Sequence, residues 1–398
     1  MSTAPTDAPS ASARPRLASI TGLRFLAALA VFLFHIAIFR PFSHTGVSDA
    51  LFTAFSKAGW AGVSFFFLLS GYVLTWAARP GDPVTAFWRR RLLKLFPNHL
   101  VTYALTMALY AIASVSLGTA LLNLVLLQPW ATGEPVFFSV NNPSWSLGCE
   151  LFFYLMFPLL HRWIAAVPAG RLWWWAAGLM GAIIALPAVA YAAVPGEPSM
   201  MAPDTPVPAL GFWLVYIFPI TRLLDFTLGI VMARVVLEGR WPRLPLAPVL
   251  ALLLACYALS LHLPGLYALT ATSVVPFALL IPAVATLDVR GRHTVLRGRT
   301  MTWLGEVSFA FYLVHWPVLN YGQRLLGEGR QYSLPMGTAL VALCFAVSLL
   351  LAWLLYIGVE RPAMRRWSGR RPRAMAPETA RRPTGPPPVP ALPTDLRP

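Results

Sequence analysis

This chain contains a series of apolar segments, each about as long as a membrane span. A hydrocarbon core of about 30 Å is crossed by roughly 20 helical residues, and a helix satisfies its own backbone hydrogen bonds in lipid. With 57% hydrophobic and 12% charged residues, the composition excludes an ordinary soluble protein. We predict an all-α, polytopic integral membrane protein with about ten transmembrane helices. They are expected at 18–39, 59–78, 98–118, 144–165, 172–194, 210–233, 244–262, 265–287, 303–323 and 335–358.

The basic residues indicate how the chain is oriented. The 31 Lys and Arg residues give a formal net charge of +16, which by itself would suit nucleic acid. Most of them fall on one side of the predicted spans, as the positive-inside rule requires of cytoplasmic segments. We therefore expect cytoplasmic N and C termini, a lipid bilayer as the surrounding partner, and no nucleic acid.

Two terminal segments differ from the apolar region between them. Residues 1–17 and 363–398 are rich in Pro, Ala and Arg and carry too few large apolar side chains to offset the entropy of ordering. We predict a disordered cytoplasmic N-tail and a basic, Pro-rich, disordered cytoplasmic C-tail. Residues 18–362 hold no polar stretch long enough for a separate soluble domain, so they form one transmembrane domain.

The first span carries two ionisable residues, Arg24 and His35. They are eleven residues apart, so they share a helix face at a separation of about 16 Å. A charged group inside a span is expensive and is by default a functional hypothesis. The alternative is that Arg24 snorkels to the inner headgroups and His35 makes an interhelical contact.

A carboxylate in the fourth span is a candidate partner for that histidine. In "NNPSWSLGCELFFY", Asn142 suits the N-cap and Pro143 the first helical position. Counting about 1.5 Å per residue from the outer ends puts Glu150 and His35 roughly 10 and 8 Å deep, so the two can meet. An imidazole oriented by a carboxylate can act as general base toward a hydroxyl, although a structural hydrogen-bonded pair is equally compatible with the spacing.

A basic run, "FWRRRLLKLFP", lies on the predicted inner loop between spans two and three. Its cations are Arg89, Arg90, Arg91 and Lys94. They suit either topology and contact with anionic lipids, or the binding of a phosphorylated cytoplasmic ligand. Arg91 and Lys94 are three residues apart, so on a helix they would form a two-cation clamp.

Three further ionisable residues lie in later spans. Arg222 and Asp225 are spaced i to i+3 and can neutralise each other, and His315 lies in span nine; we favour structural pairing for all three. The seven histidines make no H-x-x-x-H pair, so no metal is predicted. A transporter or flippase that uses His35, Glu150 and these residues as a path is the alternative to an enzyme.

An ordered set of motifs resembles the membrane-bound acyltransferase 3 family. The motifs are "GLRFLAALAVFLFH", "GVSFFFLLSGYVL", "RRRLLKLFP", "SWSLGCELFFYLMFP", "RLLDFTLG", "GEVSFAFYLVHWPV" and "VERP". The resemblance spans residues 18–362 and implies a transmembrane acyltransferase domain. Members move acyl groups from coenzyme A thioesters to hydroxyls of carbohydrates, peptidoglycan or natural products.

The resemblance assigns roles to individual residues. It implies that His35, Glu150 and Arg24 are the catalytic residues. It also implies that the basic run binds acyl-CoA. Lys94 stands where the family generally has a second arginine, so a planar fork is lost there. The residues expected to support the substrate or the structure are Ser144, Trp145, Ser146, Arg222, Asp225 and His315.

The same resemblance sets expectations for the whole reaction. It implies a stand-alone O-acyltransferase without a hydrolase-like domain, acting on a carbohydrate (surface polysaccharide) or on a glycosylated natural product such as a macrolide. Acyl-CoA is the donor co-substrate, and no cofactor is expected to stay bound. His35 activates the hydroxyl directly or through an acyl-histidine, while Glu150 orients the imidazole. We expect a multi-pass protein of the bacterial inner (cytoplasmic) membrane.

Overall fold

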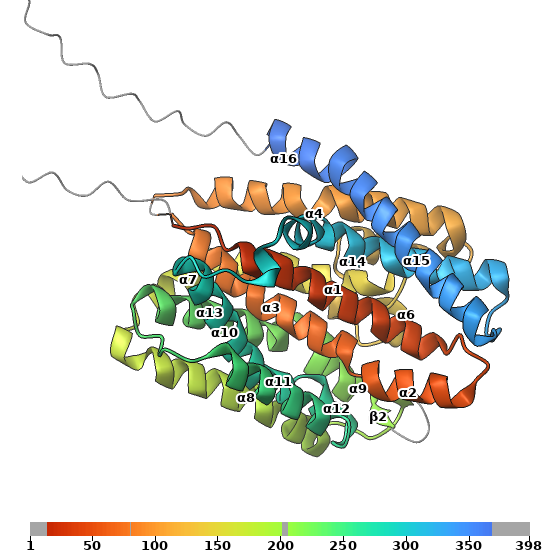
Figure 1. Ribbon diagram of the computed structural model, residues 1–398, viewed down its shortest axis with the longest axis horizontal. Coiled ribbons are helices and arrows are strands. Elements are labelled where there is room, and N and C mark those ends of the chain that lie inside the picture. The colour runs from red at the N-terminus through yellow and green to blue at the C-terminus, as the bar shows by residue number, and fades with distance from the viewer. Residues whose placement is uncertain (1–13, 80, 201–205, 368–398) are drawn as a thin grey trace, which may run out of the picture.

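The computed structural model describes residues 14–79, 81–200 and 206–367. Nearly all regular structure in these residues is helical, apart from a two-stranded antiparallel pair of β1 (Ser199–Met200) and β2 (Val207–Pro208). The long helices lie side by side, with the start of α1 (Ala18–Phe39) at the left in Figure 1 and its end at the right. The protein is therefore an all-α, multi-pass membrane protein.

Within the described residues, six helical stretches are long and apolar enough to cross a membrane. They are Ala18–Phe39, Thr45–Ala77, Ala169–Ala193, Ala209–Leu237, Gly265–Val289 and Leu334–Arg366. The other four predicted spans are helical but shorter or more polar, and they correspond to α4 (Val84–Thr106), α7 (Trp145–Ala165), α11 (Leu246–Ser260) and α14 (Arg299–Leu326). The number of ten crossings stays a prediction.

The remaining helices complete the bundle. The longer ones are α2 (Thr45–Phe55), α3 (Ala58–Ala77), α8 (Leu172–Ala193), α10 (Pro219–Leu237), α13 (Ala271–Val289) and α15 (Leu334–Leu355). The short ones are α5 (Leu117–Leu124), α6 (Glu134–Phe137), α9 (Ala209–Phe212), α12 (Gly265–Leu269) and α16 (Arg361–Trp367). π-helical turns at Met107–Ala111, Trp213–Ile217 and Tyr356–Glu360 follow α4, α9 and α15 directly.

The helix α3 lies at the centre, packed against α1 on one side and α10 on the other. At the α3–α10 crossing, a Cβ on Gly71 would overlap the carbonyl oxygen of Phe226, and a Cβ on Gly229 would overlap that of Leu68. The two backbones therefore touch, as small residues allow in membrane helices.

One predicted loop is wrong. The basic run at 87–97 forms the first turns of α4, which begins at Val84, fourteen residues before the predicted span. Arg, Lys and Leu are good helix formers, and the extended Pro83 before them gives the helix a clear start. Arg91 and Lys94 consequently share a rigid helix face.

The described structure also extends beyond the predicted domain boundaries at 18 and 362. Arg14 donates hydrogen bonds from Nη1 to the carbonyls of Thr75 and Trp76, at 3.2 and 2.7 Å, and α16 continues to Trp367. The rest of the two predicted tails, residues 1–13 and 368–398, lies outside the described residues.

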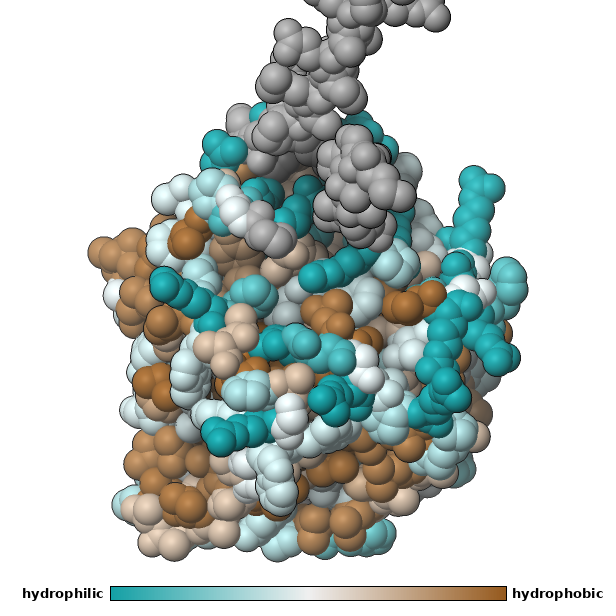
Figure 2. Space-filling model, turned by 90° about the vertical axis from the view of Figure 1, so that its left-hand side faces the viewer, coloured by the Kyte–Doolittle hydropathy of each residue, from teal (hydrophilic) through white to brown (hydrophobic). Residues whose placement is uncertain are grey.

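Hydrophilic side chains gather at the end of the bundle where α1 begins, which we call the basic end. In Figure 2, which views this end, they cover much of the surface between apolar flanks. Exposed arginines flank the helix ends that meet here, among them Arg16, Arg79, Arg162, Arg171, Arg240, Arg243, Arg290, Arg292 and Arg299. The predicted asymmetry of charge is thus a property of the folded molecule.

Candidate functional site

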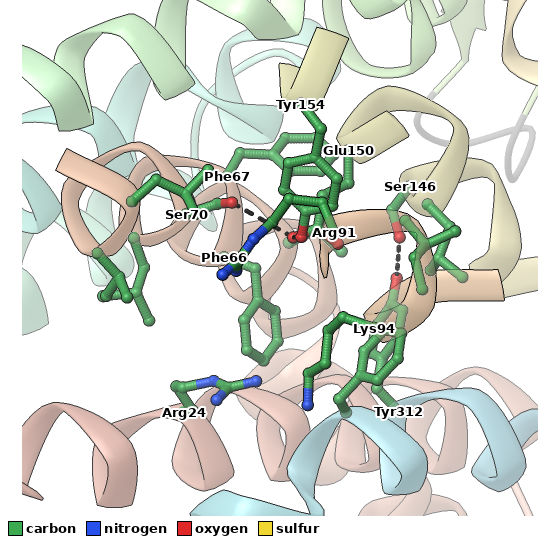
Figure 3. Close-up of a pocket in the computed structure, with 17 residues that line it drawn as sticks. Arg24, Phe66, Phe67, Ser70, Arg91, Lys94, Ser146, Glu150, Tyr154 and Tyr312 are labelled. Atoms are coloured by element: carbon green, nitrogen blue, oxygen red, sulfur yellow. Dashed lines mark hydrogen bonds between the residues drawn. The ribbon is translucent and has the colours of Figure 1, made fainter. Parts of the chain in front are cut away.

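A cavity of about 160 Å³ opens between α1, α3, α4, α7 and α14. We call it the basic pocket, because Arg24, Arg91 and Lys94 line it together with Glu150. Figure 3 shows Arg24 of α1 and Lys94 of α4 across the pocket from Glu150 of α7, with Arg91 of α4 beside Glu150. The predicted two-cation clamp of Arg91 and Lys94 is formed on one face of α4.

Only part of the basic run faces this pocket. Arg89 is exposed and Arg90 forms an ion pair with Asp82 near the start of α4, and neither lines the pocket. The guanidinium of Arg91 lies 5.7 Å from the Phe87 ring, and its Nε is buried without a hydrogen-bond partner among the described residues. Arg91 is thus the member of the run that lines the pocket without a hydrogen bond at Nε.

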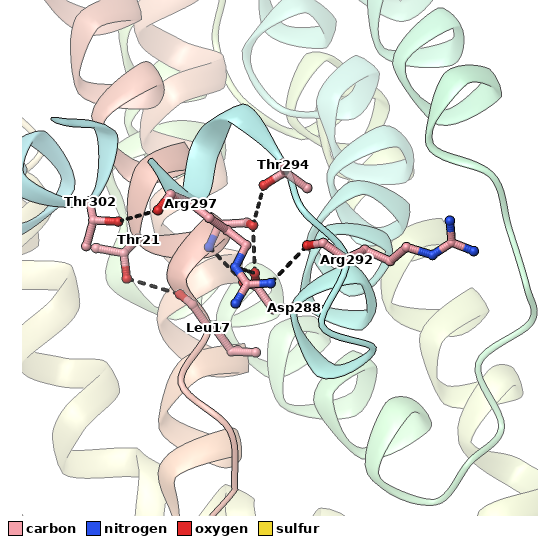
Figure 4. A network of polar contacts seen from close by, with 8 residues as sticks. Leu17, Thr21, Asp288, Arg292, Thr294, Arg297 and Thr302 are labelled. Carbon is pink, nitrogen blue, oxygen red and sulfur yellow. Dashed lines mark hydrogen bonds and ion pairs between the residues drawn. The ribbon is translucent and has the colours of Figure 1, made fainter. Parts of the chain in front are cut away.

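The start of α1, which positions Arg24, is fixed by a buried carboxylate (Figure 4). Asp288 at the end of α13 accepts hydrogen bonds from the backbone N and from Oγ of Ser19, both at 2.7 Å. Arg297 approaches the same carboxylate at 3.5 Å. Because the first N–H groups of a helix have no partner within it, a carboxylate there both caps the helix and complements its dipole.

Glu150 has hydroxyl partners inside the basic pocket. Tyr154 donates to its Oε1 at 2.5 Å and Ser70 at 3.3 Å. Its side chain shares the pocket with Arg24 and Arg91 rather than with His35. Its negative charge therefore partly neutralises the cations around it.

Sequence reasoning missed a second carboxylate that reaches this pocket indirectly. Glu360, buried at 2% exposure, forms an ion pair with Lys94 and accepts a hydrogen bond from Asn98 Nδ2 at 2.6 Å. It lies in the "VERP" motif after the last predicted span. A carboxylate close to an apolar span was the signal that could have indicated it.

A second, larger cavity lies toward the other end of α1. Its volume is about 500 Å³, and we call it the aromatic pocket. His35 lines it, among rings that come from several helices. These are chiefly Phe34, Trp60, Phe138, Trp145, Phe212, Tyr216, Tyr312 and Trp316.

His35 makes its side-chain hydrogen bond with another histidine. His315 Nε2 lies 3.1 Å from His35 Nδ1, and His315 Nδ1 lies 3.3 Å from the carbonyl oxygen of Phe311. The exposed fractions of the two residues are 7% for His35 and 0% for His315. His315 was predicted to have a structural partner, and that partner is His35, the residue that the sequence analysis assigned to catalysis.

The predicted contact between His35 and Glu150 is not formed, since the two residues line different pockets. The depth count assumed that α7 begins at the membrane surface. In fact a 3₁₀ turn at Asn142–Ser144 precedes it, α7 begins at Trp145, and residues 139–141, 143 and 144 are themselves buried. The count along each helix fixed no rotation about its axis, and Glu150 lines the basic pocket beside Arg24.

The two pockets share a wall. Val63 and Tyr312 line both of them. The hydroxyl of Tyr312 lies 2.8 Å from Ser146 Oγ and donates toward the carbonyl of Pro143 at 3.2 Å. A group bound in one pocket is thus separated from the other by a single layer of side chains.

The other predicted support residues lie around the pockets. Arg222 forms the expected pair with Asp225 at 3.4 Å and donates to Ser64 Oγ at 2.8 Å, with both charged groups buried. Trp145 lines the aromatic pocket. Ser144 Oγ accepts a hydrogen bond from Gln128 Nε2 at 3.2 Å, which holds the turn before α7.

The site thus consists of a cationic pocket and a histidine-bearing pocket on either side of one wall, within a multi-pass helical protein. The chain belongs to the acyltransferase 3 family: the family model, described as an acyltransferase domain, matches residues 17–357. It is an O-acyltransferase.

Similar proteins agree with this assignment. The chain is 42% identical over 376 residues to acyltransferase MdmB of Streptomyces mycarofaciens, covering 92% of this chain and 96% of that protein. It is 24% identical over 335 residues to the peptidoglycan O-acetyltransferase OatA of Listeria monocytogenes, covering 77% of this chain and 50% of that protein. No solved structure matches the chain significantly.

Proposed function

We propose that this enzyme transfers an acyl group from acyl-CoA to a hydroxyl of a carbohydrate or of a glycosylated natural product such as a macrolide. The observation that carries the proposal is the shared wall: a cationic pocket and a pocket that contains His35 meet at Val63 and Tyr312. A donor bound on one side and an acceptor bound on the other would meet at this wall.

The basic pocket suits the donor. Arg24, Arg91 and Lys94 offer charge-assisted hydrogen bonds to phosphate oxygens. A cavity of about 160 Å³ admits a narrow chain but not a nucleotide. In this proposal the nucleotide stays at the basic end, the cations hold its phosphates, and the pantetheine arm carries the thioester toward Tyr312.

The aromatic pocket suits the acceptor. Its volume of about 500 Å³ and its ring-lined walls fit the apolar faces of sugar rings or of a macrolide, with a few polar groups to orient them. His35 in this pocket is the proposed general base. The 24% identical relative is named for peptidoglycan, which agrees with a carbohydrate acceptor.

The proposed reaction balances without a cofactor. His35 takes the proton of the acceptor hydroxyl as the oxygen attacks the thioester carbonyl carbon. The C–S bond then breaks, and the leaving thiolate of coenzyme A takes the proton back from His35. Direct transfer of the acyl group from coenzyme A to the acceptor hydroxyl needs one step fewer. An acyl-histidine intermediate would require His35 itself to attack the thioester carbonyl carbon.

The charge distribution supports one orientation of the protein in the membrane. With the basic end in the cytoplasm, as the positive-inside rule favours, the donor pocket faces the compartment that holds acyl-CoA. The aromatic pocket then lies toward the outer side of a bacterial inner membrane. Both termini are cytoplasmic in this proposal.

Release of free coenzyme A tests the proposal. Purified protein in detergent is given a panel of acyl-CoA donors with sugar and macrolide acceptors, beside its His35→Ala variant. We expect acceptor-dependent thiol release that the variant loses. Equal release by both proteins would remove His35 from the mechanism. Activity seen only as solute movement into sealed vesicles would favour the transporter alternative.

A further inference from the structure

The histidine pair allows the protons on both rings to be assigned. The Nδ1 of His315 lies 3.3 Å from the carbonyl oxygen of Phe311. A carbonyl oxygen only accepts hydrogen bonds, so the nitrogen that faces it carries a proton. The ring of His315 is fully buried among aromatic neighbours, with the Phe311 and Phe32 centroids at 6.1 and 6.4 Å.

This burial decides the state of the other nitrogen of His315. An unpaired charge in such an apolar site is costly, so we take the ring of His315 as neutral. A neutral imidazole with its proton on Nδ1 has an unprotonated Nε2, which accepts a hydrogen bond. The atom 3.1 Å away, Nδ1 of His35, must then be the donor.

This assignment also fixes the other nitrogen of His35. A neutral imidazole carries one ring proton, so a His35 that donates from Nδ1 to His315 keeps a lone pair on Nε2.

The pair is placed so that one of its two histidines reaches a cavity. His35 lines the aromatic pocket, whereas His315 lines neither cavity described above. The rings of Phe34 and Trp316 lie edge-on to His35, with centroids at 5.0 and 4.8 Å, so its ring has little freedom to turn. Since Nδ1 is engaged by His315, Nε2 is the nitrogen left to face a substrate.

We propose that His315 is the positioning residue of the transfer reaction, holding His35 in the tautomer whose Nε2 can accept the proton of the acceptor hydroxyl. This inference rests on the proposed function, in which His35 is the base. During the reaction Nε2 gains the hydroxyl proton and passes it to the departing thiolate, while the Nδ1 proton stays on His35 and is shared with His315. Glu150, in the basic pocket, takes no part in this orientation.

Two amide substitutions separate the two hydrogen bonds of His315. A Gln side chain places its oxygen near the position of Nε2, so His315→Gln keeps an acceptor for the His35 proton. An Asn side chain places its amide near Nδ1, so His315→Asn keeps the donor to Phe311 but leaves His35 without its partner. His315→Leu removes both hydrogen bonds and retains apolar volume.

The experiment measures kcat and KM for acyl-CoA and for acceptor on the monodisperse fraction of each variant. We expect kcat to fall about 100-fold or more in the Leu and Asn variants, the range that a positioned general base contributes. The Gln variant should recover to within about tenfold of wild type, and KM for both substrates should change little. His99→Gln, at a buried histidine that bonds the carbonyl of Asn123 outside both pockets, is the matched control and should retain wild-type kcat.

The outcomes separate this inference from the proposal on which it depends. If His35→Ala keeps wild-type kcat, the general-base role itself fails. If His35→Ala is inactive but the Gln, Asn and Leu variants of His315 all behave alike, the positioning role is overturned. Recovery by Asn but not by Gln would also overturn it, since the bond to Phe311 would then be the one that matters.

Discussion

Glu360 at the end of the π-turn after α15 forms a buried ion pair with Lys94 of α4, which lines the basic pocket. The exposed fractions of the two side chains are 2% for Glu360 and 28% for Lys94. Lys94 therefore serves two purposes: it lines the pocket and it fastens the last long helix to α4. The charge of Arg91 is not engaged in this pair.

The unequal burial of the two partners predicts unequal costs of removing them. Lys94→Met leaves the buried Glu360 with only Asn98, and should lower the free energy of unfolding by about 3 kcal/mol. Glu360→Gln leaves a lysine that can turn toward water, and should cost about 1 kcal/mol. Thermal unfolding in detergent measures both, and the double variant should be more stable than the sum of the single effects predicts. If the two single losses of unfolding free energy simply add up in the double variant, Lys94 and Glu360 are not energetically coupled.

Arg91 is expected to contribute most of the donor affinity that the basic run provides. Its side chain faces the pocket with an unpartnered Nε, so Arg91→Gln should raise KM for acyl-CoA by about 10- to 100-fold, as the loss of a charged hydrogen bond implies. Arg89→Gln is the matched control, two residues away and exposed, and should change KM less than about threefold. Equal increases of KM in the Arg91 and Arg89 variants would mean that acyl-CoA responds to the total charge of the basic run and not to the position of Arg91 in the basic pocket.

The placement of Glu150 predicts which kinetic constant it controls. A carboxylate that oriented His35 would lower kcat by about 10²- to 10⁴-fold when removed. In the structure Glu150 bonds Tyr154 and Ser70 among the cations of the basic pocket. Glu150→Gln should therefore change KM for acyl-CoA and leave kcat with saturating substrates within about tenfold of wild type. A collapse of kcat at unchanged KM would return Glu150 to the role of orienting residue.

These residues show how far the sequence determines the site. Relations within one helix followed from periodicity: the face shared by Arg91 and Lys94, and the Arg222–Asp225 pair, depend only on a spacing of three residues. The span count and charge asymmetry likewise indicated a multi-pass helical protein and its basic end.

Relations between helices did not follow in the same way. Whether His35 meets Glu150 or His315 depends on where each helix begins and how it is rotated, and no residue spacing within a helix encodes either. Glu150 lines the basic pocket with Arg24, whereas His35 lines the aromatic pocket. The bond between His35 and His315 joins residues 280 positions apart, so only the packing of α1 against α14 reveals it.

The pair of Arg222 and Asp225 is predicted to stabilise the fold without serving the reaction. Both side chains are buried and line neither cavity, so Arg222→Met should destabilise by about 3–5 kcal/mol through the unpaired Asp225. Adding Asp225→Leu should recover much of the lost stability, because the unpaired buried carboxylate is then removed. The yield of monodisperse protein reports the stability, and kcat per folded molecule should stay near wild type. A double variant that folds but loses kcat would assign the pair to the reaction.

Tyr312 is predicted to close the wall between the two cavities while no acceptor is bound, and so to keep the donor apart from water in the aromatic pocket. Its ring lines both cavities, and its hydroxyl is held by Ser146 and Pro143. Tyr312→Ala should join the cavities, so that water in the enlarged space competes with the acceptor for the thioester. The ratio of coenzyme A released without acceptor to that released with acceptor should then rise about tenfold or more. Tyr312→Phe keeps the ring and should leave the ratio near wild type, because the wall depends on the volume of the side chain. An unchanged ratio in a folded Ala variant would show that the two cavities are separated by something other than this ring.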